Sequence, residues 1–359
     1  MRRVSSADSD ADSEVVTLAG REPKGTVTMT DLLTPLSFSG LRLRNRIVMP
    51  PMWSGQANPD GTVTAKIIDY HRARAAAGCG LVIVEHSFVE SGGRHTATQM
   101  GVHSDEMVEG LSRLASAIRA EGAVAALQLS HAGSRASLAV LGTRPVAPSA
   151  VRHPYEPAGD VPDELRSSRI RGTVEAFGNA AARARLAGFD AIEIHAAHGF
   201  LLSEFLSPLT NRREDEYGGS LEGRSRIHLE ILAEARRRTG PEFPVFVRLG
   251  AHDETPGGLE LDASCKVAAM LESSGASLID VSGGLQGSRG IGRSPGYFVP
   301  YAAAIKAEVN IPVIVTGGIR EPALADRIVR EGKADLVGIG RAMLEDAEWA
   351  SGAIRELSR

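Results

Sequence analysis

Short runs of aliphatic and β-branched residues alternate with longer amphipathic stretches from residue 32 onward. Continuous apolar runs are typical of strands buried on both faces of a parallel sheet, and the longer stretches between them are typical of covering helices. The predicted strands are residues 46–52 (RIVMPPM), 81–85 (LVIVE), 123–130 (AVAALQLS), 191–195 (AIEIH), 244–250 (PVFVRLG), 278–283 (LIDVSG), 312–318 (PVIVTGG) and 336–340 (LVGIG). The predicted helices are residues 64–77, 105–121, 173–187, 223–239, 262–274, 299–309, 322–331 and 341–357.

Eight strand–helix units favour a (β/α)8 TIM barrel, an α/β fold of about 250 residues that tolerates insertions. A doubly wound sheet is the main rival, but no G-x-G-x-x-G motif follows the first strand, and the glycine-rich turns come after the sixth, seventh and eighth strands instead. The longest connection, residues 131–169, is rich in proline and is expected to cap the barrel mouth after strand 3. Residues 1–28 are predicted to form a disordered tail, and residues 29–359 the barrel domain.

Composition excludes several classes of function. The chain of 359 residues is 43% hydrophobic, and its 40 Lys and Arg against 44 Asp and Glu leave a net charge of −4, with no basic block for a nucleic acid. Two cysteines, Cys79 and Cys265, are too few for a disulfide framework or a four-thiolate cluster. No run approaches the roughly 20 apolar residues of a membrane span, so we expect a cytoplasmic protein without a membrane partner.

Glycine and polar residues gather where the predicted strands end, which is the face that carries active sites in TIM barrels. The turns SGG (282–284), TGG (316–318) and GIGR (338–341) offer backbone N–H groups and one cation. Such turns suit a phosphate group, and Gly283, Gly318, Gly340 and Arg341 are therefore candidate ligand-binding residues.

His195 and His198 lie three residues apart at the end of the fourth strand, so both imidazoles can reach one bound group. A catalytic zinc needs a further protein ligand, and no acid or thiol is spaced to supply it, so we favour paired donors to a carbonyl or anionic oxygen and predict no metal site. A metal and purely local hydrogen bonding are the alternatives. Arg248 ends the fifth strand, where it could face an electron-rich ring or form an ion pair with Glu193 or Asp280.

Four stretches resemble the Old Yellow Enzyme family of FMN-dependent ene-reductases, in particular its bacterial single-domain branch. They are LRLRNRIVMPPM (41–52), QLSHAG (128–133), GFDAIEIHAAHGFLLSEFLSPLTNRREDEYGGSLEGRSR (188–226) and the segment from GGI (317–319) to ADLVGIGRAML (334–344). The resemblance covers about residues 32–349. It implies an (α/β)8 barrel with FMN at its mouth, NADPH or NADH as reductant, a small activated alkene as substrate, and leaves open whether the chain forms a homo-oligomer.

The resemblance also implies roles for individual residues. The residues expected to bind the cofactor are Pro51, Met52 and Trp53 along the isoalloxazine, His86 beside them, Gln128 at the pyrimidine edge, Arg248 near N1 and O2, and Gly283, Gly318, Gly340 and Arg341 at the phosphate. His195 and His198 are expected to bind the oxygen of an α,β-unsaturated carbonyl compound, so that its β-carbon accepts hydride from flavin N5.

Four positions depart from the family pattern, and one of them, Gly55, stands where related bacterial members carry a tyrosine. Phe200 stands where most members have a tyrosine that protonates the α-carbon, so water, His131 or Tyr155 would have to supply this proton. Trp53 and His86 stand where smaller residues are usual, which indicates a remodelled pocket and a substrate other than a generic small enone. A double-bond isomerase or desaturase, and a non-catalytic flavin-binding paralogue, are the alternative functions.

Overall fold

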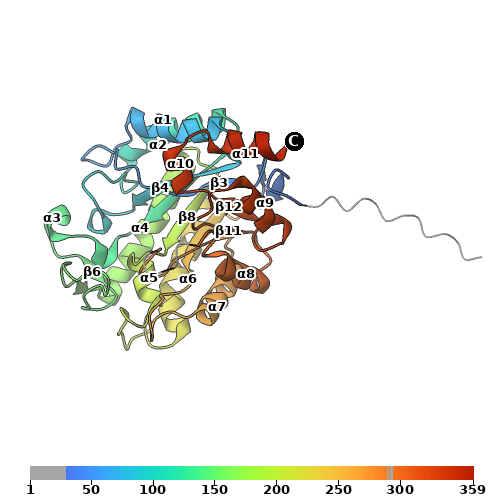
Figure 1. Ribbon diagram of the computed structural model, residues 1–359. Coiled ribbons are helices and arrows are strands. Elements are labelled where there is room, and N and C mark those ends of the chain that lie inside the picture. The colour runs from blue at the N-terminus through green and yellow to red at the C-terminus, as the bar shows by residue number, and fades with distance from the viewer. Residues whose placement is uncertain (1–29, 289–290, 292–293) are drawn as a thin grey trace, which may run out of the picture.

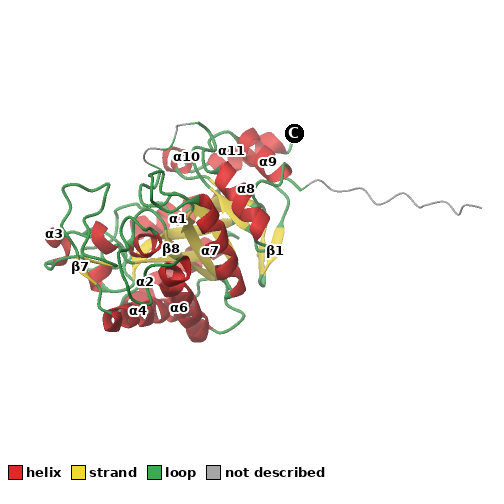
Figure 2. Cartoon of the chain, turned by 90° about the horizontal axis from the view of Figure 1, so that it is seen from below, coloured by secondary structure: helices red, strands yellow, loops and turns green. Residues whose placement is uncertain are grey.

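Eight parallel strands close into a barrel in the computed structural model, which describes residues 30–288, 291 and 294–359 (Figures 1 and 2). The predicted tail at residues 1–28 lies outside the described residues. The closed barrel confirms the TIM-barrel prediction and excludes the doubly wound sheet. In chain order its strands are β3 (Ile47–Met49), β4 (Leu81–Phe88), β5 (Val124–Ser130), β8 (Ala191–Ala196), β9 (Val245–Gly250), β10 (Leu278–Ser282), β11 (Val313–Val315) and β12 (Leu336–Gly338).

Helices surround the barrel and cover the outer faces of its strands (Figure 2). The longer ones are α1 (Ala65–Ala76), α2 (Val108–Ala120), α4 (Ser167–Leu186), α6 (Leu221–Thr239), α7 (Leu261–Ser273), α8 (Val299–Glu308), α9 (Pro322–Arg330) and α11 (Trp349–Leu357). The shorter ones are α3 (Leu138–Leu141), α5 (Leu201–Leu206) and α10 (Arg341–Glu345), with 3-10 turns η1 (Ser91–Gly93), η2 (Asp105–Met107) and η3 (Gly133–Arg135). Among the described residues, no helix combines the length and apolar character that crossing a membrane requires.

Element boundaries differ from the sequence prediction for local reasons. The first barrel strand ends at Met49 rather than at residue 52, because Pro50 and Pro51 have no N–H to donate to a neighbouring strand. The last predicted helix is two helices, α10 and α11, separated where Asp346 has an extended backbone. Helix α6 agrees closely with its prediction, since the Ser220 hydroxyl accepts a hydrogen bond from the Gly223 N–H at its start.

A small antiparallel hairpin precedes the barrel and was not predicted. It consists of β1 (Leu36–Phe38) and β2 (Leu41–Leu43), and its side chains pack against the inner layer of the barrel, where the ring centroids of Phe38 and Phe246 are 6.0 Å apart. This hairpin lies near the N-terminal ends of the strands and leaves the opposite end for a ligand.

The connection after β5 forms the expected long segment. It contains η3, α3 and a two-stranded parallel sheet of β6 (Val146–Ala147) and β7 (Asp163–Glu164) before helix α4 begins. Its Arg135 donates a hydrogen bond to the backbone oxygen of His198 over 2.7 Å. The segment therefore reaches the residues that follow β8 at the carboxyl end of the barrel.

Candidate active site

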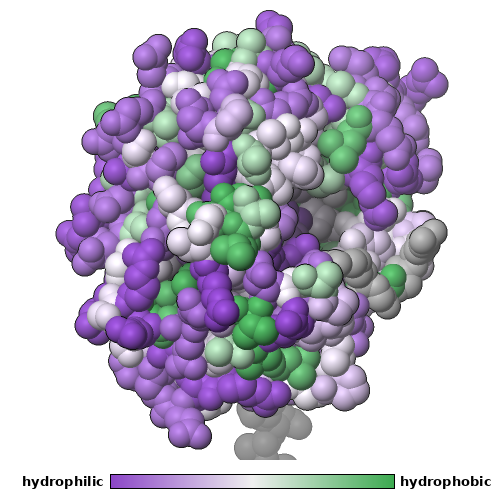
Figure 3. All heavy atoms as spheres, turned by 90° about the vertical axis from the view of Figure 1, so that its left-hand side faces the viewer, coloured by the Kyte–Doolittle hydropathy of each residue, from purple (hydrophilic) through white to green (hydrophobic). Residues whose placement is uncertain are grey.

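The carboxyl ends of the barrel strands surround a cavity of about 430 Å³, within the range of small-molecule sites. The molecule is hollowed on the face seen in Figure 3, with small groups of hydrophobic side chains among hydrophilic ones around the hollow. Eleven of the thirteen predicted site residues line the cavity. They are Pro51, Met52, Trp53, His86, His195, His198, Phe200, Arg248, Gly318, Gly340 and Arg341.

One end of the cavity is built from the turns after β11 and β12. Gly317 and Gly318 have positive φ angles of 107° and 69°, a region that favours glycine. A Cβ atom on Gly317 would lie 2.7 Å from the Tyr297 ring, and one on Gly318 would lie 3.0 Å from it. Arg341 donates a hydrogen bond to the Tyr297 hydroxyl over 3.2 Å. We refer to Gly317, Gly318, Tyr297, Gly340 and Arg341 as the phosphate end, because its bare backbone and its guanidinium suit an anion.

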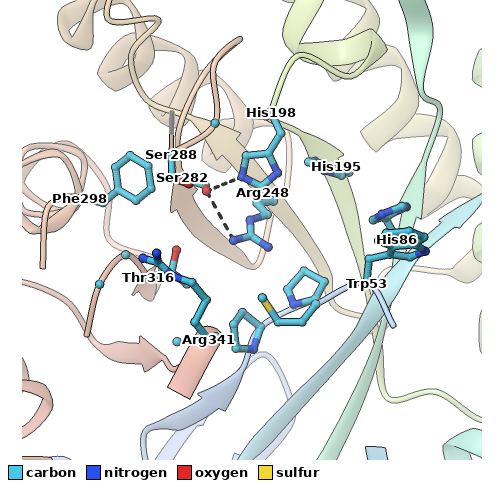
Figure 4. Close-up of a pocket in the computed structure, with 18 of the residues that line it drawn as sticks. Trp53, His86, His195, His198, Arg248, Ser282, Ser288, Phe298, Thr316 and Arg341 are labelled. Carbon is cyan, nitrogen blue, oxygen red and sulfur yellow. Dashed lines mark hydrogen bonds between the residues drawn. The ribbon is translucent and has the colours of Figure 1, made fainter. Parts of the chain in front are cut away.

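Arg248 lies between the two ends of the cavity (Figure 4). Its Nε atom is 3.3 Å from the Asp280 carboxylate, so the structural ion pair considered as an alternative forms with Asp280. Burial and the neighbouring Asp280 raise the pKa of Glu193 well above its ordinary value, and the Glu193 carboxyl accepts a hydrogen bond from Gln128 over 2.6 Å. The Asp280 carboxylate thus holds Arg248, which still lines the cavity.

His195 and His198 line the other end of the cavity. Their ring centroids are 5.0 Å apart. The Ala197 N–H donates to His195 Nδ1 over 3.3 Å, so a neutral His195 carries its proton on Nε2 and offers an N–H donor. His198 Nε2 lies 2.6 Å from the Ser282 hydroxyl, an interaction drawn in Figure 4.

The backbone at His198 is unusual. Its φ angle is 61°, in the left-handed region that non-glycine residues rarely adopt, and Gly199 follows with a φ angle of 70°. The His198 N–H donates to the Gly283 oxygen over 3.1 Å, and the His198 oxygen accepts from Arg135. Strained backbone held from both sides is common at functional sites, where it aims a side chain.

The histidines at this end are neutral. Burial, followed by the charge of His198 and of Arg248, lowers the pKa of His195 well below its ordinary value. Burial, followed by Arg248 and Arg135, does the same to the pKa of His198. Both rings therefore act as neutral hydrogen-bond donors or acceptors near pH 7, and neither is an acid in its imidazolium form.

Phe200 completes this second end. Its ring centroid lies 4.8 Å from that of His195, 5.3 Å from that of His86 and 5.2 Å from that of His95, and Arg135 lies 5.6 Å from its centre. We refer to Trp53, His86, His95, Arg135, His195, His198 and Phe200 as the substrate end. Neither His131 nor Tyr155, the alternative proton donors, lines the cavity.

Two predicted cofactor-binding residues do not line the cavity. Gln128 is buried behind it and gives its amide N–H to Glu193, while Gly283 accepts the His198 N–H and makes close backbone contact with Gly287. Their binding roles stay predictions. The described residues contain no group of three or more His, Cys, Asp or Glu side chains that could hold a metal ion.

Sequence reasoning missed several lining residues. Ser282 stood within the recognised SGG turn and could have been found there, because it ends β10 beside Arg248. His95 follows β4 and Arg135 belongs to η3 after β5, each several residues beyond the end of its strand, and the motifs at the strand ends did not single them out. Only the path of the loops after β4 and β5 brings these two side chains to the cavity.

The residues present fit a flavin mononucleotide. The phosphate end combines glycines at which a Cβ would intrude with a guanidinium, as a phosphate requires. Arg248 lines the cavity while its Nε atom is paired with Asp280, so a polar ring edge in the cavity would find a cationic neighbour. Pro50, Pro51 and Met52 form an apolar floor suited to a flat ring system.

Comparison with known proteins agrees with this fit. Residues 31–358 match the family model of the NADH:flavin oxidoreductase / NADH oxidase family. The chain is 39% identical to an NADPH dehydrogenase of Bacillus subtilis over 328 residues, which cover 91% of the chain and 95% of that protein. It is 42% identical to an NADH oxidase of Thermoanaerobacter brockii over 319 residues, which cover 87% of the chain. The chain spans about half of the length of that NADH oxidase, 49%.

Solved structures give the same picture. The structure of the old yellow enzyme homologue from Zymomonas mobilis superposes with a TM-score of 0.80 at 28% identity, covering 91% of this chain and 93% of that one. A complex of 2-naphthoyl-CoA reductase with 2-naphthoyl-CoA superposes with a TM-score of 0.87 at 27% identity, covering 92% of this chain and 52% of that one. The barrel is thus shared with both of these proteins.

Proposed function

The chain belongs to the NADH:flavin oxidoreductase / NADH oxidase family, which includes the Old Yellow Enzymes, and on this premise we propose that it reduces the activated double bond of an α,β-unsaturated carbonyl compound. FMN and NAD(P)H are the cofactors of this family. The observation that carries the proposal is the His195–His198 pair, two neutral rings of which His195 offers an Nε2–H donor, in the same cavity as Arg248 and the phosphate end.

The proposed roles follow from the donors and charges described above. When bound, FMN supplies the hydride that a nicotinamide nucleotide has delivered to it. Gly318, Gly340 and Arg341 hold its phosphate, and Arg248 places a permanent positive charge next to its ring, where negative charge is stabilised. His195 donates its Nε2–H to the carbonyl oxygen of the substrate. His198, whose ring centroid is 5.0 Å from that of His195, contacts the same oxygen. These bonds withdraw electrons from the double bond.

The α-carbon proton comes from solvent in this proposal. Phe200 has no proton to give, and the neutral histidines around it are poor acids. The described residues that line the cavity include no Asp or Glu. The hydrogen added at the α-carbon is therefore expected to come from water.

Anaerobic turnover tests the proposal. The FMN-loaded protein is mixed with NADPH or NADH and with cyclohexenone in deuterated water, and the product is examined by mass spectrometry and NMR. We expect a saturated ketone with unlabelled hydride at the β-carbon and deuterium at the α-carbon. The double variant His195→Ala, His198→Ala should still be reduced by NAD(P)H but lose enone reduction by about a hundredfold or more. Enone reduction unaffected by that variant would contradict the assigned roles.

A second candidate function is favoured by Phe200 itself. If hydride returns from the β-carbon to the flavin faster than solvent protonates the α-carbon, the double bond is restored rather than saturated. Rotation about the Cα–Cβ single bond before that return would interconvert the Z and E isomers of the substrate. Incubation of the reduced protein with the Z isomer of an acyclic enone separates the two candidates, because an isomerase of this kind converts it to the E isomer without net consumption of NAD(P)H. A saturated product in stoichiometric amount supports the reductase.

A further inference from the structure

His86 lies in the wall of the cavity at the substrate end. Its ring centroid is 5.3 Å from that of Phe200 and 6.4 Å from that of His195. Figure 4 shows His86 with Trp53 and His195 on one side of the cavity, opposite Phe298, Thr316 and Arg341. The side chain is thus close to the histidine pair and far from the phosphate end.

Gln99 determines which nitrogen of His86 carries the proton. The Gln99 Oε1 atom accepts the His95 N–H over 2.7 Å, which leaves the amide nitrogen facing His86. That nitrogen donates to the His86 backbone oxygen over 3.2 Å and lies 2.7 Å from His86 Nδ1. Because an amide nitrogen only donates, Nδ1 accepts, and neutral His86 carries its hydrogen on Nε2.

His86 keeps this tautomer over a wide pH range. Burial, helped by the charges of His95 and Arg135, lowers the pKa of His86 to about 3. No hydrogen bond joins His86 Nε2 to another described residue, while Gln99 holds the ring from the Nδ1 side. The ring therefore offers one oriented donor to whatever occupies the cavity.

The charges around this donor favour an anion. The described lining residues include four arginines and four histidines but no acid. Arg320 and Arg341 line the cavity with the glycines of the phosphate end, and Arg248 lies between the ends, so Arg135 is the arginine of the substrate end. Arg135 pairs with Glu156 over 3.1 Å, but Glu156 does not line the cavity, so an occupant faces the guanidinium rather than the carboxylate.

We propose that the His86 Nε2–H, in the positive field of Arg135, forms a subsite for a carboxylate of the substrate. The substrate class is then an unsaturated ketone or aldehyde with a carboxylate on the far side of its double bond. The placement of the carbonyl on His195 and His198 rests on the proposed function. A short conjugated chain spans the distance from the histidine pair to His86, whose rings are 6.4 Å apart at His195. This role goes beyond the cofactor-binding one predicted for His86.

Binding of unreactive product analogues tests the subsite without any turnover. The FMN-loaded protein is titrated by calorimetry at pH 7.5 with 4-oxo-4-phenylbutanoate, its methyl ester and 1-phenylbutan-1-one, which share the phenyl ketone and differ at one end. We expect the carboxylate to bind about tenfold more tightly than either neutral compound, as a hydrogen bond to a charged group predicts. A carboxylate that binds no more tightly than its ester overturns the proposal.

Variants assign the effect to His86. His86→Phe keeps an aromatic ring and removes the donor, so the carboxylate should bind about tenfold more weakly and the neutral ketone should change less than about twofold. His103→Phe is the matched control, because His103 stacks on Phe88 outside the cavity. His86→Gln, which retains a donor, should keep most of the preference and serves if His86→Phe does not fold. A His86→Phe protein with the preference intact overturns the proposal.

The two proposals fail in different ways. Tighter binding of the carboxylate without any enone reduction would support the subsite and contradict the proposed reaction. Enone reduction together with equal binding of the three analogues would support the proposed reaction and contradict the subsite.

Discussion

The two ends of the cavity are built by different means. The phosphate end relies on backbone: Gly317 and Gly318 have positive φ angles, and little space remains for a Cβ beside Tyr297. The substrate end relies on side chains, with His86, His195 and Phe200 packed ring to ring. Backbone geometry tolerates few substitutions, whereas side chains can be exchanged while the barrel stays intact. From this difference we expect the end with the familiar glycine pattern to hold the flavin phosphate and the end with the departures to set the substrate.

The phosphate end is most sharply tested by Gly318→Ala. The added methyl group lies 3.0 Å from the Tyr297 ring and 3.2 Å from the Ser294 oxygen, within the cradle. We expect the affinity for FMN to fall by about a hundredfold, equivalent to about 2.8 kcal/mol. Fluorescence titration of flavin-free protein with FMN measures this loss.

Gly332→Ala is the matched control for backbone strain. Gly332 has a φ angle of 66°, close to the 69° of Gly318, and open space where a Cβ would lie. Both variants should lose about 1–2 kcal/mol of folding stability, but only Gly318→Ala should lose FMN. Equal loss of FMN in both would mean that general destabilisation, rather than the cradle, explains the effect.

Phe200→Tyr tests the substrate end. A phenol at this position supplies an acid where the neutral histidines supply none. Enone saturation should therefore become faster by on the order of tenfold. This factor is smaller than the rate increase of about 10²–10⁴ from a well-placed general acid, because solvent already delivers the proton. Stopped-flow reoxidation of the reduced protein by cyclohexenone measures the rate. Phe200→Leu lacks both ring and hydroxyl and should show no acceleration. A tyrosine variant no faster than the native protein would show that proton delivery does not limit turnover.

Trp53 and Gly55 couple a backbone position to the substrate end. The indole is 47% exposed, and a Cβ on Gly55 would lie 3.1 Å from its Cζ2 atom. Gly55→Ala should displace the indole ring and change the dissociation constant of 1-phenylbutan-1-one by about threefold. This change is smaller than the one expected from the loss of one hydrogen bond to a charged group. Gly257→Ala, with a φ angle of 77° and open space around it, is the control and should leave this binding unchanged.

The smallest expected effect is that of pH on binding of a neutral ketone. The pKa of His86 is lowered to about 3, and those of His195 and His198 are well below the ordinary value, so all three rings remain neutral as pH falls from 9 to 6. Binding of 1-phenylbutan-1-one should therefore vary less than about twofold over this interval. An inflection near pH 6.5 in the binding affinity would mean that one of these rings titrates normally and that the substrate end is more accessible to solvent than described.

Much of the barrel could be predicted because each strand is marked by residues that are neighbours along the chain. All eight predicted strands become barrel strands, since continuous apolar runs have only one stable placement between an inner core and covering helices. The hairpin of β1 and β2 was missed because three-residue strands carry too little periodicity to be seen, and only the packing of Phe38 on Phe246 explains it.

The sequence by itself determined the fold class, the face that carries the cavity, and residues near the carboxyl ends of strands, such as His195 and Arg248. Each of these depends on a run of neighbours along the chain. Only the tertiary structure decided that Arg135 and His95 reach the cavity, that Gln128 turns to Glu193, and that Gln99 sets the proton of His86. These contacts join residues from different loops and strands, and the direction of a side chain there depends on packing and on the pairing of buried polar groups.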